Sequence, residues 1–223
     1  MKKELVLGHL LSEGIIQNLN EITKIQFSKA GKCKVTLKPS IHLDSRIASS
    51  LPFARVITTA CGQANTWPLS KLLDRIKPPK VESNVRVNAQ LIVEACRRLN
   101  TLARTFRETG GVHAAAMFSS RGDLISFAED VGRHNAVDKA IGAASIRGHI
   151  FSESFLTSTG RLSGDIVLKT ARVKIPIVAS LAAALSSGVK IAEMTGVTLI
   201  GFVRGHRMNI YTHSKRVTVG KPT

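Results

Sequence analysis

The stretch FLTSTGRLSGDIVLKTARVKIPIVASLAAALSSGVKIAEMTGVTLIGFV, residues 155–203, decides the fold class. It alternates short apolar runs with segments of helical character: apolar runs at 155–159, 175–181 and 197–203, and helical segments at 163–174 and 186–196. Such alternation is typical of an α/β domain with a largely parallel sheet and helices on both of its faces. We therefore expect a domain of this kind around the stretch.

The sequence on either side extends the same pattern. Asn88 has the residue type of a helix N-cap. The apolar residues that follow it share one helical face, and Gly110-Gly111 ends the helix: Ile92, Cys96, Leu99, Ala103 and Phe106. Four further elements complete the predicted domain: strands over 112–118 and 123–129, a helix over 134–146 and a last strand over 208–213.

The first third of the chain reads differently. A helix is expected over residues 4–16, and a β-hairpin over residues 22–39 with its turn at Ala30-Gly31-Lys32. Residues 39–87 hold five of the seven prolines and show little periodicity beyond a short helix over 68–76. The Pro78-Pro79 pair indicates a hinge. We divide the chain into two parts: residues 1–87, with the helix, the hairpin and a loop region, and residues 88–223, an α/β ligand-binding domain.

The charge balance narrows the class of partner. The 223 residues are 43% hydrophobic and 21% charged, which is a globular composition and excludes a disordered or fibrous chain. Lys and Arg number 32 against 15 Asp and Glu, so the formal net charge is +17. Such an excess implies an anionic partner. Aromatic residues are only 4% of the chain, so stacking platforms for single-stranded nucleic acid are scarce.

The cysteines and the apolar runs bear on the compartment. Three cysteines are too few and too scattered for a disulfide framework. No signal peptide opens the sequence, and its longest near-apolar run, residues 175–189, is too short and too polar to span a bilayer. We therefore expect a protein of the reducing cytoplasm with no membrane contact. Cys33 and Cys96 lie on apolar faces of their predicted strand and helix, and both are expected in the core.

The segment TTACGQA, residues 58–64, contains the third cysteine. Cys61 falls in the loop-rich region, and Gly62 after it allows another molecule to approach the thiol closely. An accessible thiolate on a basic loop is a nucleophile. The segment alone favours an ordinary, partly buried cysteine instead, so its residues leave both interpretations open.

The segment GGVHAAAMF, residues 110–118, places His113 where zinc deaminases begin their H-x-E…P-C-x-x-C signature. Ala115 occupies the position of the glutamate, and no P-C-x-x-C follows. Zinc would lack two thiolates and the proton shuttle would be absent. A structural histidine at a strand edge is therefore the favoured interpretation, and we predict no metal site.

The segment EDVGRHNAVDK, residues 129–139, crowds charges where a strand gives way to a helix. The N-terminus of that helix offers free N–H groups to an anion, and Arg133 and His134 add charge-assisted hydrogen bonds. Asn135 belongs to the same candidate ligand-binding group. Asp138 and Lys139 are expected to be surface charges of a solvated helix start.

Two loops share one position relative to the sheet. The segments STGRLSGD (158–165) and GFVRGHRMNIYTH (201–213) each place Gly and Arg directly after an apolar strand. Open α/β sheets bind ligands at these carboxyl ends. The candidate anion-binding residues are Ser158, Gly160, Arg161 and Ser163 in the first loop, and Arg204, Gly205, His206 and Arg207 in the second. After Glu193 the chain has no acidic residue, so a bulky anion would fit between the loops.

Together these segments resemble the FdhD family of formate dehydrogenase accessory sulfur carriers. The likeness rests on residues 4–16, TTACGQA, GGVHAAA, EDVGRHNAVDK, GRLSGDIVLKTARVKIPIVAS and GFVRGHRMNIYTH, in the order of the family, and EDVGRHNAVDK is the most specific. The resemblance implies a cytidine-deaminase-like three-layer α/β/α domain with a smaller N-terminal α+β portion.

The resemblance also implies a mechanism. Such proteins accept sulfur from a cysteine desulfurase as a cysteine persulfide, and they pass it to molybdenum bis(molybdopterin guanine dinucleotide) before this cofactor enters the formate dehydrogenase apoenzyme. The family's persulfide cysteine corresponds to Cys61. Its cofactor-binding segment corresponds to Phe202, Val203, Arg204, Gly205, His206 and Arg207. A guanine nucleotide would mimic part of this ligand.

Two departures from the family pattern set the alternatives. Ala64 replaces the second cysteine of the family's CGxC, so a mechanism that needs both thiols would be impaired. The strands that usually precede the N-terminal helix are missing, which indicates a wrongly assigned start, a trimmed start or a shorter branch of the family. One alternative function is that of a basic nucleic-acid-binding protein. The other is that of a nucleotide-binding relative of the deaminases, which either holds zinc or is catalytically dead. The residues do not determine whether the chain forms a homodimer.

Overall fold

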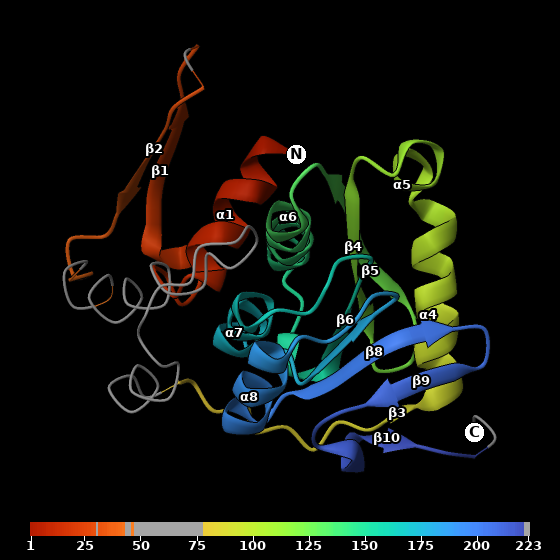
Figure 1. Ribbon diagram of the computed structural model, residues 1–223. Helices are drawn as coiled ribbons and strands as arrows, with labels where there is room; N and C mark the ends of the chain where they lie inside the picture. Colours follow the sequence, from red (N-terminus) through yellow and green to blue (C-terminus); the bar gives the residue numbers. More distant parts are fainter. Residues whose placement is uncertain (30, 43–45, 47–77, 221–223) are drawn as a thin grey trace, which may run out of the picture.

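The computed structural model describes residues 1–29, 31–42, 46 and 78–220 (Figure 1). Its elements follow one another along the chain as α1 Lys2–Ser12, η1 Leu19–Glu21, β1 Ile22–Phe27, β2 Cys33–Leu37, β3 Val87–Asn88, α4 Ala89–Leu102, α5 Arg104–Thr109, β4 His113–Ser119, β5 Leu124–Asp130, α6 Arg133–Ile146, η2 Phe151–Glu153, β6 Ser154–Ser158, α7 Gly164–Arg172, β7 Ile177–Ser180, α8 Ser186–Thr195, β8 Thr198–Arg204, β9 Arg207–Ile210, η3 Ser214–Arg216 and β10 Val217–Thr218.

A six-stranded sheet in the order β5-β4-β6-β7-β8-β9 forms the centre of the molecule. Only the β6–β7 and β7–β8 pairs are parallel, whereas β4 is antiparallel to both β5 and β6, and β9 is antiparallel to β8. The prediction of a largely parallel sheet is therefore wrong. Short turns join β4 to β5 and β8 to β9, and a short turn can only connect antiparallel strands. The β4–β6 pair is antiparallel as well, although β5 and α6 lie between these strands in the chain.

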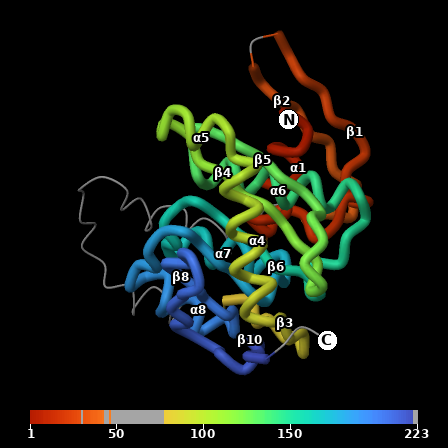
Figure 2. The backbone as a smooth tube through the Cα atoms, turned by 90° about the vertical axis from the view of Figure 1, so that its right-hand side faces the viewer, coloured from red at the N-terminus to blue at the C-terminus, as the bar shows by residue number. Residues whose placement is uncertain are grey.

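Helices cover both faces of the sheet and give three layers (Figure 1). One apolar cluster joins α1, α6, α7 and α8 to the first face, and a second joins α4 to the opposite face. Figure 2, turned by 90°, shows α4 and α5 in front of the sheet and the β1–β2 hairpin projecting from the body. The predicted α/β class with helices on both faces is thus confirmed.

The long helix predicted from residue 88 is present, but it is interrupted. Asn88 caps α4 as expected, because its side chain accepts a hydrogen bond from the N–H of Gln90 at 2.8 Å. Ile92, Cys96 and Leu99 are buried on the predicted face. At Ala103 the backbone leaves the helical region, with ψ of 69°. The Glu129 carboxylate then accepts from the N–H of Phe106 at 2.8 Å and satisfies a donor in the first turn of α5.

Helix α1 packs on α6 at unusually close range. A Cβ added to Gly8 would lie 1.7 Å from the carbonyl oxygen of Asp138, and one added to Gly142 would lie 1.9 Å from the carbonyl oxygen of Glu4. Only glycine at both positions lets the two backbones approach this closely. The predicted division at residue 87 stays a prediction, although α1 from the first part is packed against the second.

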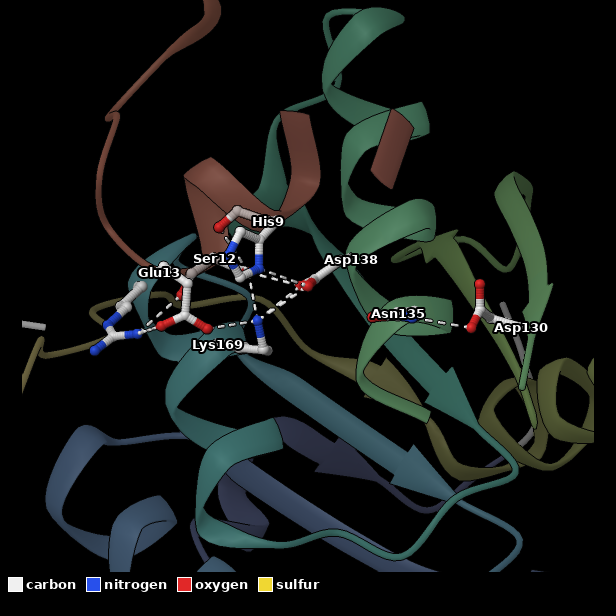
Figure 3. A network of polar contacts seen from close by, with 8 residues as sticks. His9, Ser12, Glu13, Asp130, Asn135, Asp138 and Lys169 are labelled. Atoms are coloured by element: carbon white, nitrogen blue, oxygen red, sulfur yellow. Dashed lines mark hydrogen bonds and ion pairs between the residues drawn. The ribbon is translucent and has the colours of Figure 1, made fainter. Parts of the chain in front are cut away.

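A polar network around the buried carboxylate of Asp138 links α1 and α6 to α7 (Figure 3). The Lys169 ammonium of α7 lies 3.0 Å from both carboxylate oxygens of Asp138 on α6 and 2.6 Å from Oε1 of Glu13. Ser12 donates to Asp138 at 2.7 Å, and a ring nitrogen of His9 lies 3.2 Å from the same carboxylate. Asp138 is 1% exposed, so its prediction as a surface charge is wrong.

Of the remaining predictions, some are confirmed, the one for Cys33 is wrong, and one lies outside the described residues. The hairpin is present, with Ile25 opposite Val35. Cys96 is buried as predicted, and burial raises the pKa of its thiol to about 12. Cys33 is only half-buried on β2, so the prediction that it lies in the core is wrong. The short helix over 68–76 lies outside the described residues. Among the helices that the structure describes, none is both long and apolar enough to cross a bilayer.

Candidate functional site

Three loops meet at the carboxyl ends of β6, β7 and β8. The loop after β6 is joined to the loop after β7 by hydrogen bonds from the N–H of Leu162 to the carbonyl of Ala183 at 2.9 Å and from the N–H of Leu185 to the carbonyl of Leu162 at 3.0 Å. The N–H of Phe202, near the end of β8, donates to the carbonyl of Ala182 at 3.0 Å. The two loops predicted to share a ligand are therefore connected through a third, residues 181–185.

Helix α6 brings its amino end to the first of these loops. A Cβ added to Gly160 would lie 2.9 Å from the Cβ of Arg133, so the arginine stem packs directly on the glycine. His134 Nε2 lies 3.7 Å from Oδ2 of Asp165, in the first turn of α7. The amino ends of α6 and α7 therefore converge, and each presents backbone N–H groups and a positive dipole end.

Three polar atoms at this convergence have no hydrogen-bond partner among the residues that the structure describes. They are Nε of Arg133, Nε2 of His134 and Oγ of Ser163, and all three are buried. Ser163 is 3% exposed and is the N-cap of α7, but its hydroxyl makes no capping bond. Leaving a buried polar atom unpaired is costly, so three together indicate a place that a polar ligand or water completes.

The surroundings of His113 show that this place is cationic. Burial lowers the pKa of the His113 imidazole, and the nearby charges of Arg133, Arg161 and His134 lower it further. One ring nitrogen lies 3.4 Å from the hydroxyl of Thr159, which also accepts from the N–H of Ala114 at 2.9 Å. His113 is thus tied to the first loop, and the cations around it favour an anion there.

Ser158 and Gly160 shape the first loop from inside. The hydroxyl of Ser158 accepts from the N–H of Gly160 at 3.0 Å. Ser180, at the end of β7, donates to the carbonyls of Ser158 at 2.9 Å and Gly160 at 2.7 Å, and it accepts from the N–H of Ala182. Sequence reasoning missed Ser180 and the 181–185 loop. Their position directly after β7, between two strand ends already chosen, was the signal that would have found them.

Asn135 does not join the unpaired cluster. Its side-chain amide donates to Oδ1 of Asp130 at 3.1 Å, on the side of α6 away from the buried network (Figure 3). The same carboxylate oxygen accepts from the N–H of Gly132 at 2.9 Å, and Lys139 pairs with the carboxylate. Asn135 and Asp130 therefore build the turn that starts α6. Lys139, one turn into α6, is largely buried by this ion pair, with a side chain 17% exposed, so its prediction as a solvated charge is wrong.

The segment 202–207 forms the tip of the β8–β9 hairpin. Gly205 has φ of 58°, and Arg204 pairs across the turn with Arg207. Phe202 has φ of 52°, a left-handed conformation that is uncommon outside glycine, and its ring is 40% exposed. His206 is exposed as well.

The side chains of this tip are not equally available. The Arg204 guanidinium lies 5.7 Å from the centre of the Phe202 ring, and its Nε donates to the carbonyl of Leu181. Val203 is 2% exposed and belongs to the core, so only its backbone could meet a ligand. Cys61, the predicted persulfide residue, lies outside the described residues.

Comparison with known proteins agrees with this architecture. The model of the FdhD/NarQ family matches residues 1–218. The chain is 36% identical over 219 residues to the sulfur carrier protein FdhD of Sulfurisphaera tokodaii, which covers 96% of this chain and 80% of that protein. It is 37% identical over 216 residues to the protein of the same name from Methanothermobacter thermautotrophicus, with the same shares covered.

A solved structure shares the fold as well. A structure assigned to a formate dehydrogenase accessory protein from Desulfotalea psychrophila superposes with a TM-score of 0.71 and 25% sequence identity, covering 97% of this chain and 78% of that one. The family model spans nearly the whole chain, and relatives above 30% identity align with almost all of it. The chain therefore belongs to the FdhD/NarQ family.

Proposed function

We propose that this chain is a sulfur carrier that serves formate dehydrogenase, and that its ligand is molybdenum bis(molybdopterin guanine dinucleotide). The family and the names of its relatives support the carrier role. The observation that carries the ligand is the cluster of buried polar atoms of Arg133, His134 and Ser163 that have no hydrogen-bond partner among the described residues. Two helix amino ends and several cations surround it, which is the environment that a pyrophosphate or phosphate group requires.

The carrier step uses Cys61. Its thiolate would attack the outer sulfur of a persulfide on a cysteine desulfurase, forming a new S–S bond while the desulfurase leaves as a thiolate. Cys61 then holds the sulfur as a persulfide until it meets the cofactor. Ala64 leaves only one thiol in this motif, so in this chain the relay would use a single cysteine.

The other site residues receive separate roles in this proposal. The phosphates would meet Arg133, His134, Arg161 and Ser163, and the exposed tip with Phe202, Arg204, His206 and Arg207 would meet a guanine dinucleotide arm. Gly160 and Ser158 keep the first loop close to α6. We also propose that the three-layer domain is a variant of the cytidine-deaminase-like fold, because its mixed sheet lies between two helical layers.

The test has two readouts on the full chain. After incubation with a cysteine desulfurase and cysteine, the intact mass should rise by one sulfur atom, the gain should disappear on reduction, and Cys61→Ser should show none. Calorimetry should detect GDP binding that Arg133→Met weakens. No sulfur on Cys61 together with no GDP binding would overturn the proposal, and tight binding to duplex DNA with a steep salt dependence would favour the nucleic-acid alternative.

A further inference from the structure

A cavity of about 890 Å³ lies at the amino ends of the central strands, at the opposite end of these strands from the candidate site. Residues 145–146 and 148–152 line it just before β6 begins, and Val173 and Lys174 line it just before β7. The cavity therefore faces the amino ends of these strands, whereas the candidate site lies at their carboxyl ends. Its apolar lining comes from four separate segments: Leu11, Leu19, Ile146, Ile150, Phe151 and Val173.

The lip of the cavity exposes apolar side chains. Ile150 is 62% exposed and Ile146 is 43% exposed. Their loop is held by the end of α6, where Gly148 has φ of 72° and the N–H groups of Gly148 and His149 return to the carbonyls of Ser145 and Ala144. Two isoleucines are thus presented to solvent by ordered backbone beside a concave surface, which is typical of an interaction site.

Two lysines that line the same cavity form no ion pair with a carboxylate of the described residues. The ammonium of Lys174 donates to the carbonyl of Lys80 at 2.8 Å, and the ammonium of Lys80 donates to the carbonyl of Met194 at 2.6 Å. Within the described part of the chain no carboxylate lies within 4.0 Å of either ammonium. Glu82 also lines the cavity, and it balances only one of the two charges.

The backbone of Lys174 is unusual. Its φ is 64°, in the left-handed region at the end of α7, where helices commonly place glycine. The lysine side chain makes this conformation less favourable than it would be for glycine, but it places an ammonium at the cavity. Backbone strain of this kind tends to persist at functional positions.

We propose that this cavity docks a segment of a partner protein that carries apolar side chains flanked by carboxylates. The apolar floor and the isoleucine lip match the first feature, and Lys80 and Lys174 match the second. A second copy of the chain is disfavoured because each copy carries +17. Nucleic acid is disfavoured because the floor is apolar and no arginine lines the cavity. The inference rests on the proposed function, since a sulfur carrier must bind a donor and an acceptor protein.

The test measures the affinity of the full chain for a purified cysteine desulfurase and for formate dehydrogenase apoenzyme by calorimetry. Ile150→Asp and the double variant Lys80→Glu/Lys174→Glu should each weaken binding to at least one of the two proteins by tenfold or more, roughly 1.4 kcal/mol. GDP affinity should stay unchanged. The matched controls are Val219→Asp, at a side chain that is 93% exposed, and Lys2→Glu/Lys3→Glu; both should bind as the original chain does.

A further variant separates docking from folding. Lys174→Gly suits a left-handed backbone, so its melting temperature should be unchanged or higher while its affinity for the partner falls. The proposal would be overturned if all cavity variants bound both proteins with affinities within twofold of the original. It would also be overturned if the variants bound duplex RNA more weakly but bound neither protein more weakly. If the unaltered chain takes up no sulfur and binds neither protein, the proposed function itself fails and the docking inference falls with it.

Discussion

Helix α6 carries two polar clusters that differ in one respect. Near its middle, both oxygens of Asp138 are satisfied, by Ser12 and Lys169 on one oxygen and by His9 and Lys169 on the other. About one turn nearer its amino end, Nε of Arg133 and Nε2 of His134 are buried without a hydrogen-bond partner among the described residues. The same helix thus has a cluster that is complete and one that is incomplete.

The difference separates stability from binding. A complete network has nothing left to offer a ligand, and its carboxylates and cations cancel one another. The incomplete cluster costs stability until something pairs with it, as buried donors and acceptors always do. We therefore expect substitutions in the Asp138 network to change the free energy of unfolding, and substitutions at the amino end to change ligand affinity.

The largest expected effect comes from breaking the complete network. Lys169→Met leaves the buried carboxylate of Asp138 without its cation, whereas the half-buried Glu13 keeps its ion pair with Arg172. Removing one partner of a buried ion pair costs roughly 3–5 kcal/mol. At about 2–4 °C per kcal/mol for a protein of this size, the melting temperature should fall by about 10 °C. Urea and thermal unfolding measure this loss.

A second variant decides whether charge is the cause. Adding Asp138→Asn to Lys169→Met removes one uncompensated carboxylate, so the double variant should regain part of the lost stability. The folded Lys169→Met protein should bind GDP as the original does. A drop of less than about 1 kcal/mol, or a double variant less stable than the single one, would contradict a network that stabilises through charge pairing.

The next effect belongs to the incomplete cluster. Arg133→Met keeps the stem that packs on Gly160 and removes the guanidinium, so the free energy of unfolding should change little. Hydrogen bonds to charged groups contribute roughly 1.5–3 kcal/mol, so GDP affinity should fall by about 10- to 100-fold. Calorimetry at fixed salt concentration measures the affinity.

A matched arginine provides the control. Arg97 on α4 is exposed and far along the chain from the loops, so Arg97→Met makes the same change of charge and volume on the opposite face of the sheet. Its GDP affinity should match that of the original chain. Equal losses in the two variants would mean that only overall charge attracts the nucleotide, and the comparison between the clusters would lose its basis.

Acidification should weaken the complete network. Burial raises the pKa of the Asp138 carboxyl, but bonds from His9 and Ser12 and the charge of Lys169 outweigh burial and hold the pKa below its ordinary value. The same balance with Lys169 and Arg172 lowers the pKa of Glu13. Because both folded-state values lie below the unfolded ones, near 3.9 and 4.3, their stabilisation is present above those values and is lost as the pH falls through the folded values.

The measurement is the free energy of unfolding from pH 3 to pH 8. It should fall as the pH drops below about 4, and Glu13→Gln/Asp138→Asn should flatten this fall because two of the titrating carboxylates are gone. An unchanged slope in the double variant would show that acid sensitivity arises elsewhere.

Sequence alone predicted what depends on neighbours along the chain. The strands, the N-cap of Asn88 and the apolar face of α4 follow from periodicity and local chemistry, and all are present. The candidate loops were found by their place after apolar strands, and the structure does join them. The gathering of Arg133, Gly160 and Ser163 at two helix amino ends was implied only loosely by that rule.

Features that depend on distant partners were not predictable. Asp138 reads as a surface charge because its partners Ser12 and Lys169 lie 126 and 31 positions away. The break in the long helix at Ala103 involves Glu129, which lies in strand β5. Strand directions in the sheet depend on which strands pair. An apolar run predicts a strand but does not predict whether that strand is parallel or antiparallel to its neighbours. In each case a long-range contact overrides a local preference.

The smallest expected effect tests the contact on which the incomplete cluster depends. In Gly160→Ala the new Cβ would lie 2.9 Å from the Cβ of Arg133, which is fixed to the helix backbone, so the loop or the first turn of α6 must shift and carry the arginine with it. GDP affinity should fall by about threefold, under 1 kcal/mol, because the guanidinium stays present but displaced. In the Arg133→Met background the same substitution should cost almost nothing further, since there is no guanidinium left to displace. Independent, additive losses in the double-mutant cycle would mean that Gly160 serves the loop and not the arginine, and that the amino end of α6 is less closely built for a ligand than its unpaired atoms indicate.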